Sequence, residues 1–329
     1  MTFFLALVSI ILIISASELF SNAVEWLGDS FSLSSSATGS LLAATGTALP
    51  ETIIPIIAFL LGRSVNQIGV GAILGAPLML STLTSFLMAL TIIVMRLSKK
   101  RENLYFDVPK KPIIRDMLFF IFNYLTLFAV SYIFNGRLFH IAAAIILVCS
   151  YVAYVILNLK DKSGNQGESE ELLLAKIAKL EESIYFALLQ LGLSLVVLVA
   201  AGRLFVGQIE HLGASWGASL FVISVIIAPF ATELPEKYNS FRWLLKKKDT
   251  LALTNITGAM VFQSVLPVVI GLVATGWIMS GVSVQTVLTP IVSSFLILAS
   301  LLLTGRLSAI ILLFFGAGYL INLYFLIHI

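Results

Sequence analysis

Apolar residues fill most of this chain in long stretches, and polar residues gather in the short intervals between them. Most stretches hold about 20 apolar positions, the length that an α-helix needs to cross the hydrocarbon core of a bilayer. The pattern therefore predicts an all-α polytopic membrane protein. Ten transmembrane helices are expected, at residues 2–22, 33–61, 66–96, 116–135, 138–159, 182–205, 214–244, 250–279, 284–304 and 307–328.

The composition supports a chain that is surrounded by lipid rather than water. Of its 329 residues, 59% are hydrophobic and 11% are charged, whereas soluble domains carry about 25% charged residues. No polar interval is long enough for a separate soluble domain. The first apolar stretch lacks a basic flank and a small-residue cleavage site, so we interpret it as a transmembrane helix rather than a removed signal peptide.

The distribution of positive charge predicts the orientation of the helices. If the N-terminus is outside, the outer connections hold Arg63, Arg137 and Arg203, and the cytoplasmic connections hold nearly all the other Lys and Arg residues. Cytoplasmic loops of membrane proteins carry an excess of Lys and Arg. We therefore expect an integral multi-pass protein of a prokaryotic-type cell membrane, with both termini outside.

Two segments of the chain repeat each other. Residues 16–51 align with residues 201–236 without a gap, and 13 of the 36 aligned positions are identical. We predict a first five-helix repeat at 1–159, a cytoplasmic linker at 160–181 and a second five-helix repeat at 182–329. Because five is an odd number, the second repeat is inverted, as in transporters that expose one central site alternately to each side of the membrane.

The linker changes character along its length. Its first half is flexible by composition, with the sequence KDKSGNQGES. Its second half, with leucines beside Lys176 and Lys179, is either an amphipathic helix at the membrane interface or a solvated helix that enters the sixth span.

Both repeated segments end in Leu-Pro-Glu, inside stretches of membrane length. A proline within a helix removes a backbone hydrogen bond, at a cost of about 3 kcal/mol or more, and freed carbonyls in a membrane are tolerated where they line a cavity. Pro50 and Pro235 would free the carbonyls one turn upstream. The sequence therefore predicts a helix broken at membrane depth in each repeat.

The glutamates and threonines of these motifs predict a cation site. Glu51 and Glu236 follow the two prolines directly, and Thr47 and Thr232 lie one turn upstream. Carboxylate, hydroxyl and carbonyl oxygens suit Ca²⁺, Mg²⁺, Mn²⁺ or Na⁺. Two such motifs, related by the repeat, are interpreted as two halves of one site. The alternative is that each proline only kinks a helix and each glutamate only forms a buried hydrogen bond.

The two repeats resemble the alpha-repeats of the calcium/cation antiporter superfamily, which includes the Na⁺/Ca²⁺ exchangers. The resemblance covers essentially the whole chain. Its most specific motif, Gly-Thr-Ser-Leu-Pro-Glu, is matched well by Gly46–Glu51 and less well by Ala231–Glu236. The resemblance implies a calcium site where the second, third, seventh and eighth helices meet, with the two motif glutamates as ligands helped by Thr47 and Thr232.

The chain departs from this family in its third and eighth helices. The family usually carries a glycine followed by asparagine or aspartate, then Gly-Ser-Asn. Here residues 71–77 read GAILGAP and residues 254–260 read TNITGAM, so only Asn255 keeps a polar side chain that could bind a cation. The small residues still allow a close approach of helices.

The serine of the motif is also replaced, by Ala48 in one repeat and by Glu233 in the other. Glu233 and Glu236 share a helix face, so three carboxylates are expected to converge. Like charges in a poorly hydrated site favour proton uptake by one of them. We hypothesise that Glu233 shifts the coupling towards H⁺. The alternative is an ion pair between Glu233 and Lys237.

Together these features predict a secondary active antiporter that exports Ca²⁺ or another divalent cation in exchange for Na⁺ or H⁺. The expected mechanism moves the short first and sixth spans across the core. Inorganic cations and the lipid bilayer are the expected partners, with no nucleic acid, no cofactor and no enzymatic activity. The sequence is compatible with a monomer and leaves the oligomeric state open.

Three other functions were weighed. A cation channel would conduct without counter-transport, and a non-transporting cation sensor would keep a degenerate exchanger site. An intramembrane protease would need paired aspartates at mid-span, whereas the sequence places every aspartate in a connection. These are Asp29, Asp107, Asp116, Asp161 and Asp249.

Overall fold

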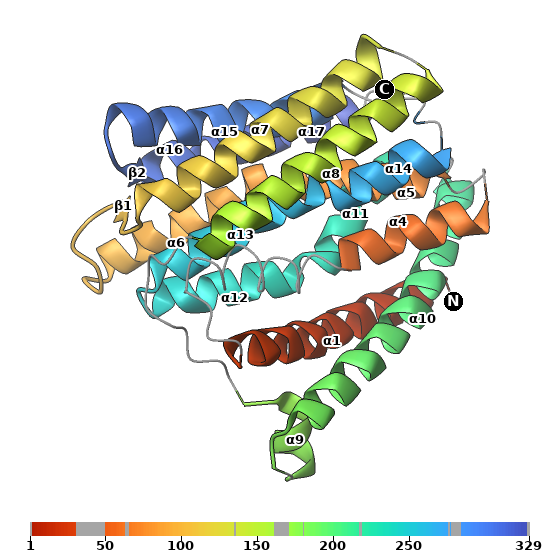
Figure 1. Cartoon of the computed structure of the whole chain (residues 1–329), viewed down its shortest axis with the longest axis horizontal. Coiled ribbons are helices and arrows are strands. Elements are labelled where there is room, and N and C mark those ends of the chain that lie inside the picture. Colours follow the sequence, from red (N-terminus) through yellow and green to blue (C-terminus); the bar gives the residue numbers. More distant parts are fainter. Residues whose placement is uncertain are drawn as a thin grey trace.

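The computed structural model describes residues 2–30, 50–62, 66–134, 136–160, 171–179, 181–216, 219–275, 277 and 284–327, and helices account for most of them. Figure 1 shows their arrangement. In chain order the elements are α1 (Thr2–Asp29), α4 (Pro50–Leu61), α5 (Asn66–Met79), the π-helix η3 (Leu80–Thr84), α6 (Ser85–Leu97), β1 (Tyr105–Phe106), α7 (Lys110–Tyr132), α8 (Arg137–Lys160), α9 (Leu173–Ala178), α10 (Ile184–Trp216), α11 (Leu220–Thr232), α12 (Leu234–Leu245), α13 (Asp249–Gln263), α14 (Leu266–Thr275), α15 (Val284–Leu303), β2 (Leu307–Ser308), α16 (Ala309–Leu313) and α17 (Phe315–Ile327).

The helices agree with the ten spans predicted from the sequence. Within the described residues, eight helical segments are long and apolar enough to cross a membrane, and Glu51–Leu61 and Leu220–Thr232 form two shorter apolar helices. These shorter helices lie in the predicted second and seventh spans, which carry the Leu-Pro-Glu motifs. The part of the second span before Pro50 lies outside the described residues.

Several predicted boundaries were wrong. The first and sixth spans are not short, because α1 has 28 residues and α10 has 33 residues. The helix α10 continues beyond the predicted end at residue 205 because no proline interrupts it. The seventh span consequently begins at Leu220 rather than at residue 214.

The helices α1 and α10 pack along each other and lie to one side of the remaining bundle (Figure 1). An apolar cluster that includes Phe20, Ile54, Phe205 and Ile223 joins this pair to α4 and α11. A separate and larger cluster holds the rest of the bundle together, from α5 to α17. The pair α1 and α10 therefore meets the core through apolar side chains, and contacts of this kind are not directional.

Small residues bring α5 and α11 unusually close, as the sequence predicted. A Cβ atom on Gly71 would lie 2.7 Å from the carbonyl oxygen of Phe221, and one on Gly75 would lie 2.4 Å from the carbonyl oxygen of Val225. The hydroxyl of Ser224 donates a hydrogen bond of 2.6 Å to the carbonyl of Ile68 across the same interface. One helix from each repeat is thus locked to the other near the motifs.

The described end of the linker contradicts one of its two interpretations. The helix α9 stops at Ala178, and Lys179 adopts a left-handed conformation with φ of 55°. The helix α10 begins only at Ile184, so no continuous helix runs from the linker into the sixth span. Backbone N–H of Leu173 donates to Asn22 of α1 at 2.9 Å, which ties the linker to the pair of long helices.

Three of the predicted cytoplasmic connections meet at one end of the bundle. Strand β1 pairs antiparallel with β2, so the connection after α6 contacts the connection after α15. Arg101 forms a buried ion pair with Asp249, at the start of α13. The connections that follow α6, α12 and α15 therefore lie together at one end of the bundle.

Candidate cation site

The Leu-Pro-Glu motifs begin helices in both repeats. The helix α4 begins at Pro50, and α12 begins at Leu234 with Pro235 in its first turn. The predicted break is present in the second repeat, where α11 ends at Thr232 and Glu233 (φ −91°, ψ 6°) separates it from α12. Proline is well suited to the first turn of a helix because the N–H that it lacks would have no partner there.

Residues Glu51 and Glu236 occupy equivalent places in the first turns of α4 and α12. Both carboxylates are buried. They belong to opposite repeats, yet each lies close enough to the other for their charges to repel. The structure therefore brings the two motif glutamates together. The positive end of each helix dipole stabilises the negative charge of its own glutamate.

The hydroxyl of Thr232 lies beside the carboxyl group of Glu51 and donates a hydrogen bond of 3.1 Å to the carbonyl of Ala228. The carbonyl of Ala231 cannot receive the usual helical bond, because Pro235 has no N–H. The last turn of α11 thus presents oxygen atoms and the negative end of its dipole beside two carboxylates. This arrangement favours a cation. The corresponding Thr47 lies outside the described residues.

Asn255 stands on α13 next to α12. Its amide nitrogen donates to the carbonyl of Glu236 at 3.3 Å and to the hydroxyl of Ser240 at 3.1 Å. Its side-chain oxygen is buried and has no hydrogen-bond partner in the described part of the chain. The amide nitrogen is therefore fixed by its neighbours, and the oxygen is available as a ligand.

Glu233 forms the ion pair that the sequence left as an alternative. The ammonium group of Lys237 lies 3.3 Å from a carboxylate oxygen of Glu233, and both side chains are buried. The charge of Glu233 also acts on Glu51 and on Glu236. Three carboxylates do converge, but one of them has a lysine as its direct partner.

The described residues contain no group of three His, Cys, Asp or Glu side chains arranged to hold a metal ion. A cation between Glu51 and Glu236 would therefore take its other ligands from hydroxyl, amide or backbone oxygens, or from water. Such a mixed oxygen shell is compatible with Ca²⁺, which accepts six to eight oxygen ligands with flexible geometry.

Sequence reasoning misplaced two of the aspartates. Asp116 lies within α7 and is buried, and it accepts hydrogen bonds from Tyr154 at 2.9 Å and from Thr257 at 2.5 Å. Asp249 is buried at the start of α13. Apolar residues begin only after Asp116 in the sequence, so the pattern did not show that α7 starts at Lys110. Asp116 and Asp249 have separate partners and do not form the aspartate pair of an intramembrane protease.

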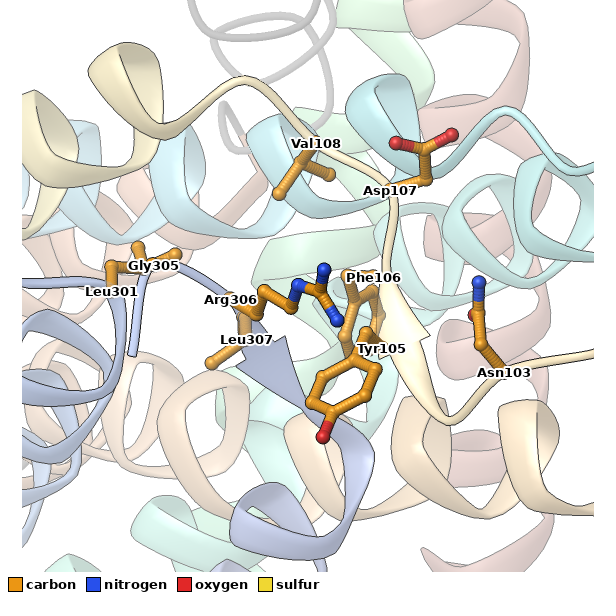
Figure 2. A pocket seen from close by; sticks show the side chains of 9 residues that line it. All are labelled: Asn103, Tyr105, Phe106, Asp107, Val108, Leu301, Gly305, Arg306 and Leu307. Atoms are coloured by element: carbon orange, nitrogen blue, oxygen red, sulfur yellow. The ribbon is translucent and has the colours of Figure 1, made fainter. Parts of the chain in front are cut away.

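A cavity of about 420 Å³ lies away from the carboxylates, between the connections that follow α6 and α15. Figure 2 shows Arg306 and Tyr105 facing each other in it, with the guanidinium 5.4 Å from the ring centre. None of the predicted cation ligands lines this cavity. Its lining residues are Asn103, Tyr105, Phe106, Asp107, Val108, Leu301, Gly305, Arg306 and Leu307.

The fold and the buried carboxylates define a class of protein: a multi-pass membrane transporter of inverted repeats whose broken helices meet at charged side chains. The sequence model of the sodium/calcium exchanger protein family matches residues 1–160 and 186–328. The chain therefore belongs to the sodium/calcium exchanger protein family. The members of this family are cation exchangers, which are transporters and not enzymes.

Individual relatives agree with this assignment. The Inner membrane protein YrbG of Escherichia coli (strain K12) is 23% identical over 273 residues, which make up 82% of this chain and 78% of that protein. The solved H⁺/Ca²⁺ exchanger CAX has a TM-score of 0.76 at 18% identity, over 98% of this chain and 82% of that chain. The sodium-calcium exchanger NCX_Mj has a TM-score of 0.63 at 20% identity, over 97% of this chain and 96% of that chain.

Proposed function

We propose that this protein exports a divalent cation, with Ca²⁺ as the expected substrate, in exchange for Na⁺ or H⁺. The observation that carries the proposal is the meeting of Glu51 and Glu236 from opposite repeats, both buried and near enough to repel each other. Burying two like charges is costly unless a cation compensates them. A divalent cation compensates both.

The proposed site comprises Glu51 and Glu236 with oxygen ligands from Thr47, Thr232 and Asn255. Glu233 stays a predicted ligand, although its ion pair with Lys237 competes with that role. The fold of this chain is similar to the solved structures of an H⁺/Ca²⁺ exchanger and of a sodium-calcium exchanger. The fold is thus compatible with either coupling ion. The coupling ion is therefore the open part of the proposal.

Alternating access would move the pair α1 and α10 against the rest of the bundle. The apolar contact between this pair and the helices α4 and α11 supports such a motion, because contacts between apolar side chains are not directional. We propose that the repeats at 1–159 and 182–329 carry the two halves of the site, with both termini outside the cell.

The test is flux into liposomes that contain the purified full-length protein. Uptake of Ca²⁺, Mg²⁺ and Mn²⁺ is measured under a Na⁺ gradient and, separately, under a pH gradient. We expect Ca²⁺ uptake that needs one of these gradients. Conductance without a counter-gradient would indicate a channel, and binding without flux would indicate a sensor.

We predict that Glu51→Gln and Glu236→Gln each lower Ca²⁺ flux by a factor of about 10 or more. The reason is that the Kd of an oxygen site for Ca²⁺ varies over roughly several orders of magnitude with the charge of its ligands. The matched control is Glu171→Gln, since Glu171 is exposed and pairs with Lys176 at the surface. The control should transport at the unmodified rate. Normal flux through either site variant would contradict the proposed site.

A further inference from the structure

Lys237 is bound like a cation in the interior of the protein. Its side chain is 7% exposed, and its ammonium lies 3.3 Å from a carboxylate oxygen of Glu233. The same ammonium lies 2.9 Å from the sulfur of Met79 and 5.5 Å from the centre of the Phe230 ring. A carboxylate, a thioether and an aromatic face thus surround a positive charge that belongs to the chain itself.

The second repeat alone carries this ion pair. Under the alignment that places Glu51 on Glu236, the positions of Glu233 and Lys237 correspond to Ala48 and Thr52. The first repeat therefore has neither charge. Because a carboxylate and an ammonium occur together in one repeat, the pair adds no net charge to the site that the repeats share.

Two neutral hydroxyl groups complete the surroundings of Glu233. Tyr124 of α7 and Tyr319 of α17 both lie within electrostatic range of its carboxylate, and neither hydroxyl has a hydrogen-bond partner among the described residues. The charged groups within electrostatic range of Glu233 are Glu51, Glu236 and Lys237, and Lys237 is the cation among them. Lys237 is therefore its counterion.

We propose that Lys237 is a built-in cation that fixes the charge of the transport site and thereby its coupling stoichiometry. This inference rests on the proposed function. When they are ionised, the carboxylates of Glu51, Glu233 and Glu236 carry three negative charges and Lys237 carries one positive charge, which leaves a net charge of −2. One divalent cation, or two monovalent cations, neutralises that charge.

The consequence is an electroneutral exchange of one divalent cation for two monovalent cations. Moving an uncompensated charge through a membrane is costly, so the site crosses most easily when its cargo balances its own charge. Without Lys237 the same site would carry three negative charges, and one divalent cation would leave one of them uncompensated. Lys237 is in this sense a residue that determines specificity.

The experiment compares Lys237→Met with the unmodified protein in liposomes whose membrane potential is clamped with valinomycin and K⁺. Ca²⁺ flux through the unmodified protein should change less than twofold between 0 and about −100 mV. A potential of about 100 mV shifts the equilibrium of a step that moves one net charge by about 50-fold. We expect the flux of Lys237→Met to follow the potential several-fold, and its Ca²⁺ affinity to rise about 10-fold, because of the added negative charge.

The double variant Glu233→Gln/Lys237→Met restores a net charge of −2 and removes both buried charges, so it also guards against a folding defect. Its flux should again be independent of the potential. Glu233→Gln alone leaves a charge of −1 and should bind Ca²⁺ about 10-fold more weakly. Size-exclusion chromatography verifies that each variant is folded.

Several results would overturn the inference. One is flux of the unmodified protein that follows the potential, and another is a Lys237→Met variant that keeps the unmodified affinity and voltage independence. A third is equal loss of Ca²⁺ binding in Glu233→Gln and in the double variant, which would make Glu233 a direct ligand. Failure of the proposed function itself is recognised differently, by normal flux through Glu51→Gln.

Discussion

Asn255 is an uncharged side chain that contributes to the cation site by holding the backbone of Glu236. Its amide nitrogen holds the carbonyl of Glu236 and the hydroxyl of Ser240, and its oxygen has no hydrogen-bond partner in the described part of the chain. The backbone that carries Glu236 is thereby anchored to α13. Groups that orient a ligand commonly matter almost as much as the ligand itself.

We expect Asn255→Ala to weaken Ca²⁺ binding about 10- to 100-fold, the usual effect of removing a group that orients a metal ligand. Binding to the purified protein is measured by isothermal titration calorimetry. Asn158→Ala is the control, because Asn158 is also buried and hydrogen-bonded: it donates to the carbonyl of Tyr154 in its own helix α8 and accepts from Arg115 of α7. An unchanged affinity in Asn255→Ala would show that α12 positions Glu236 without help from α13.

At the scale of elements, the contact between α5 and α11 decides how closely the two repeats approach. The glycines of α5 allow the backbone of α11 to lie where a side chain would otherwise stand. The same stretch, GAILGAP at residues 71–77, carries no polar side chain, so its contribution here is packing. This contact keeps the last turn of α11, with Thr232, in register with the site.

Gly75→Ala should destabilise the protein by about 1–3 kcal/mol, because the new methyl group overlaps the carbonyl of Val225. Gly207→Ala is the matched control on α10, where a Cβ atom meets nothing within 4 Å. There the change should stabilise the helix by about 0.5–1 kcal/mol. Thermal unfolding in detergent measures both variants, and equal shifts in the same direction would contradict the close approach.

At the scale of the whole molecule, the two repeats are also joined at the end that carries the basic connections. Asp249 accepts hydrogen bonds from Arg101 at 3.0 Å and from the backbone N–H of Asp107 at 2.8 Å. These partners come from the connection between α6 and α7, whereas Asp249 begins α13. The ion pair therefore fixes one repeat to the other at a distance from the cation site.

Asp249→Asn should lower stability by about 3–5 kcal/mol, because it leaves the guanidinium of Arg101 buried without its counter-charge. Lys176→Gln disrupts an exposed ion pair with Glu171 and should change stability by no more than about 1 kcal/mol. The midpoint of thermal unfolding in detergent is the measurement. Similar losses in the two variants would mean that Asp249 does not hold the repeats together.

The sequence by itself determined the class of the fold and the location of the helix break in the second repeat. Apolar length predicts spans because lipid imposes a fixed thickness, and the repeated Leu-Pro-Glu motifs predict breaks because proline cannot donate a hydrogen bond. The pairing of Glu51 with Glu236 followed from the repeat rather than from either segment alone. The lengths of α1 and α10 were underestimated, because a helix can continue past the end of its apolar stretch.

Only the tertiary structure decided which partner each buried charge has. The sequence favoured Glu233 as a group of the cation site and left an ion pair with Lys237 as the alternative. The fold brings Glu233 to Lys237, while Met79 and Phe230 contact other sides of the ammonium. Asp116 and Asp249 acquired partners more than a hundred residues away in the sequence. Local sequence cannot show such contacts, because the energy of a buried charge depends on groups that only packing brings within reach.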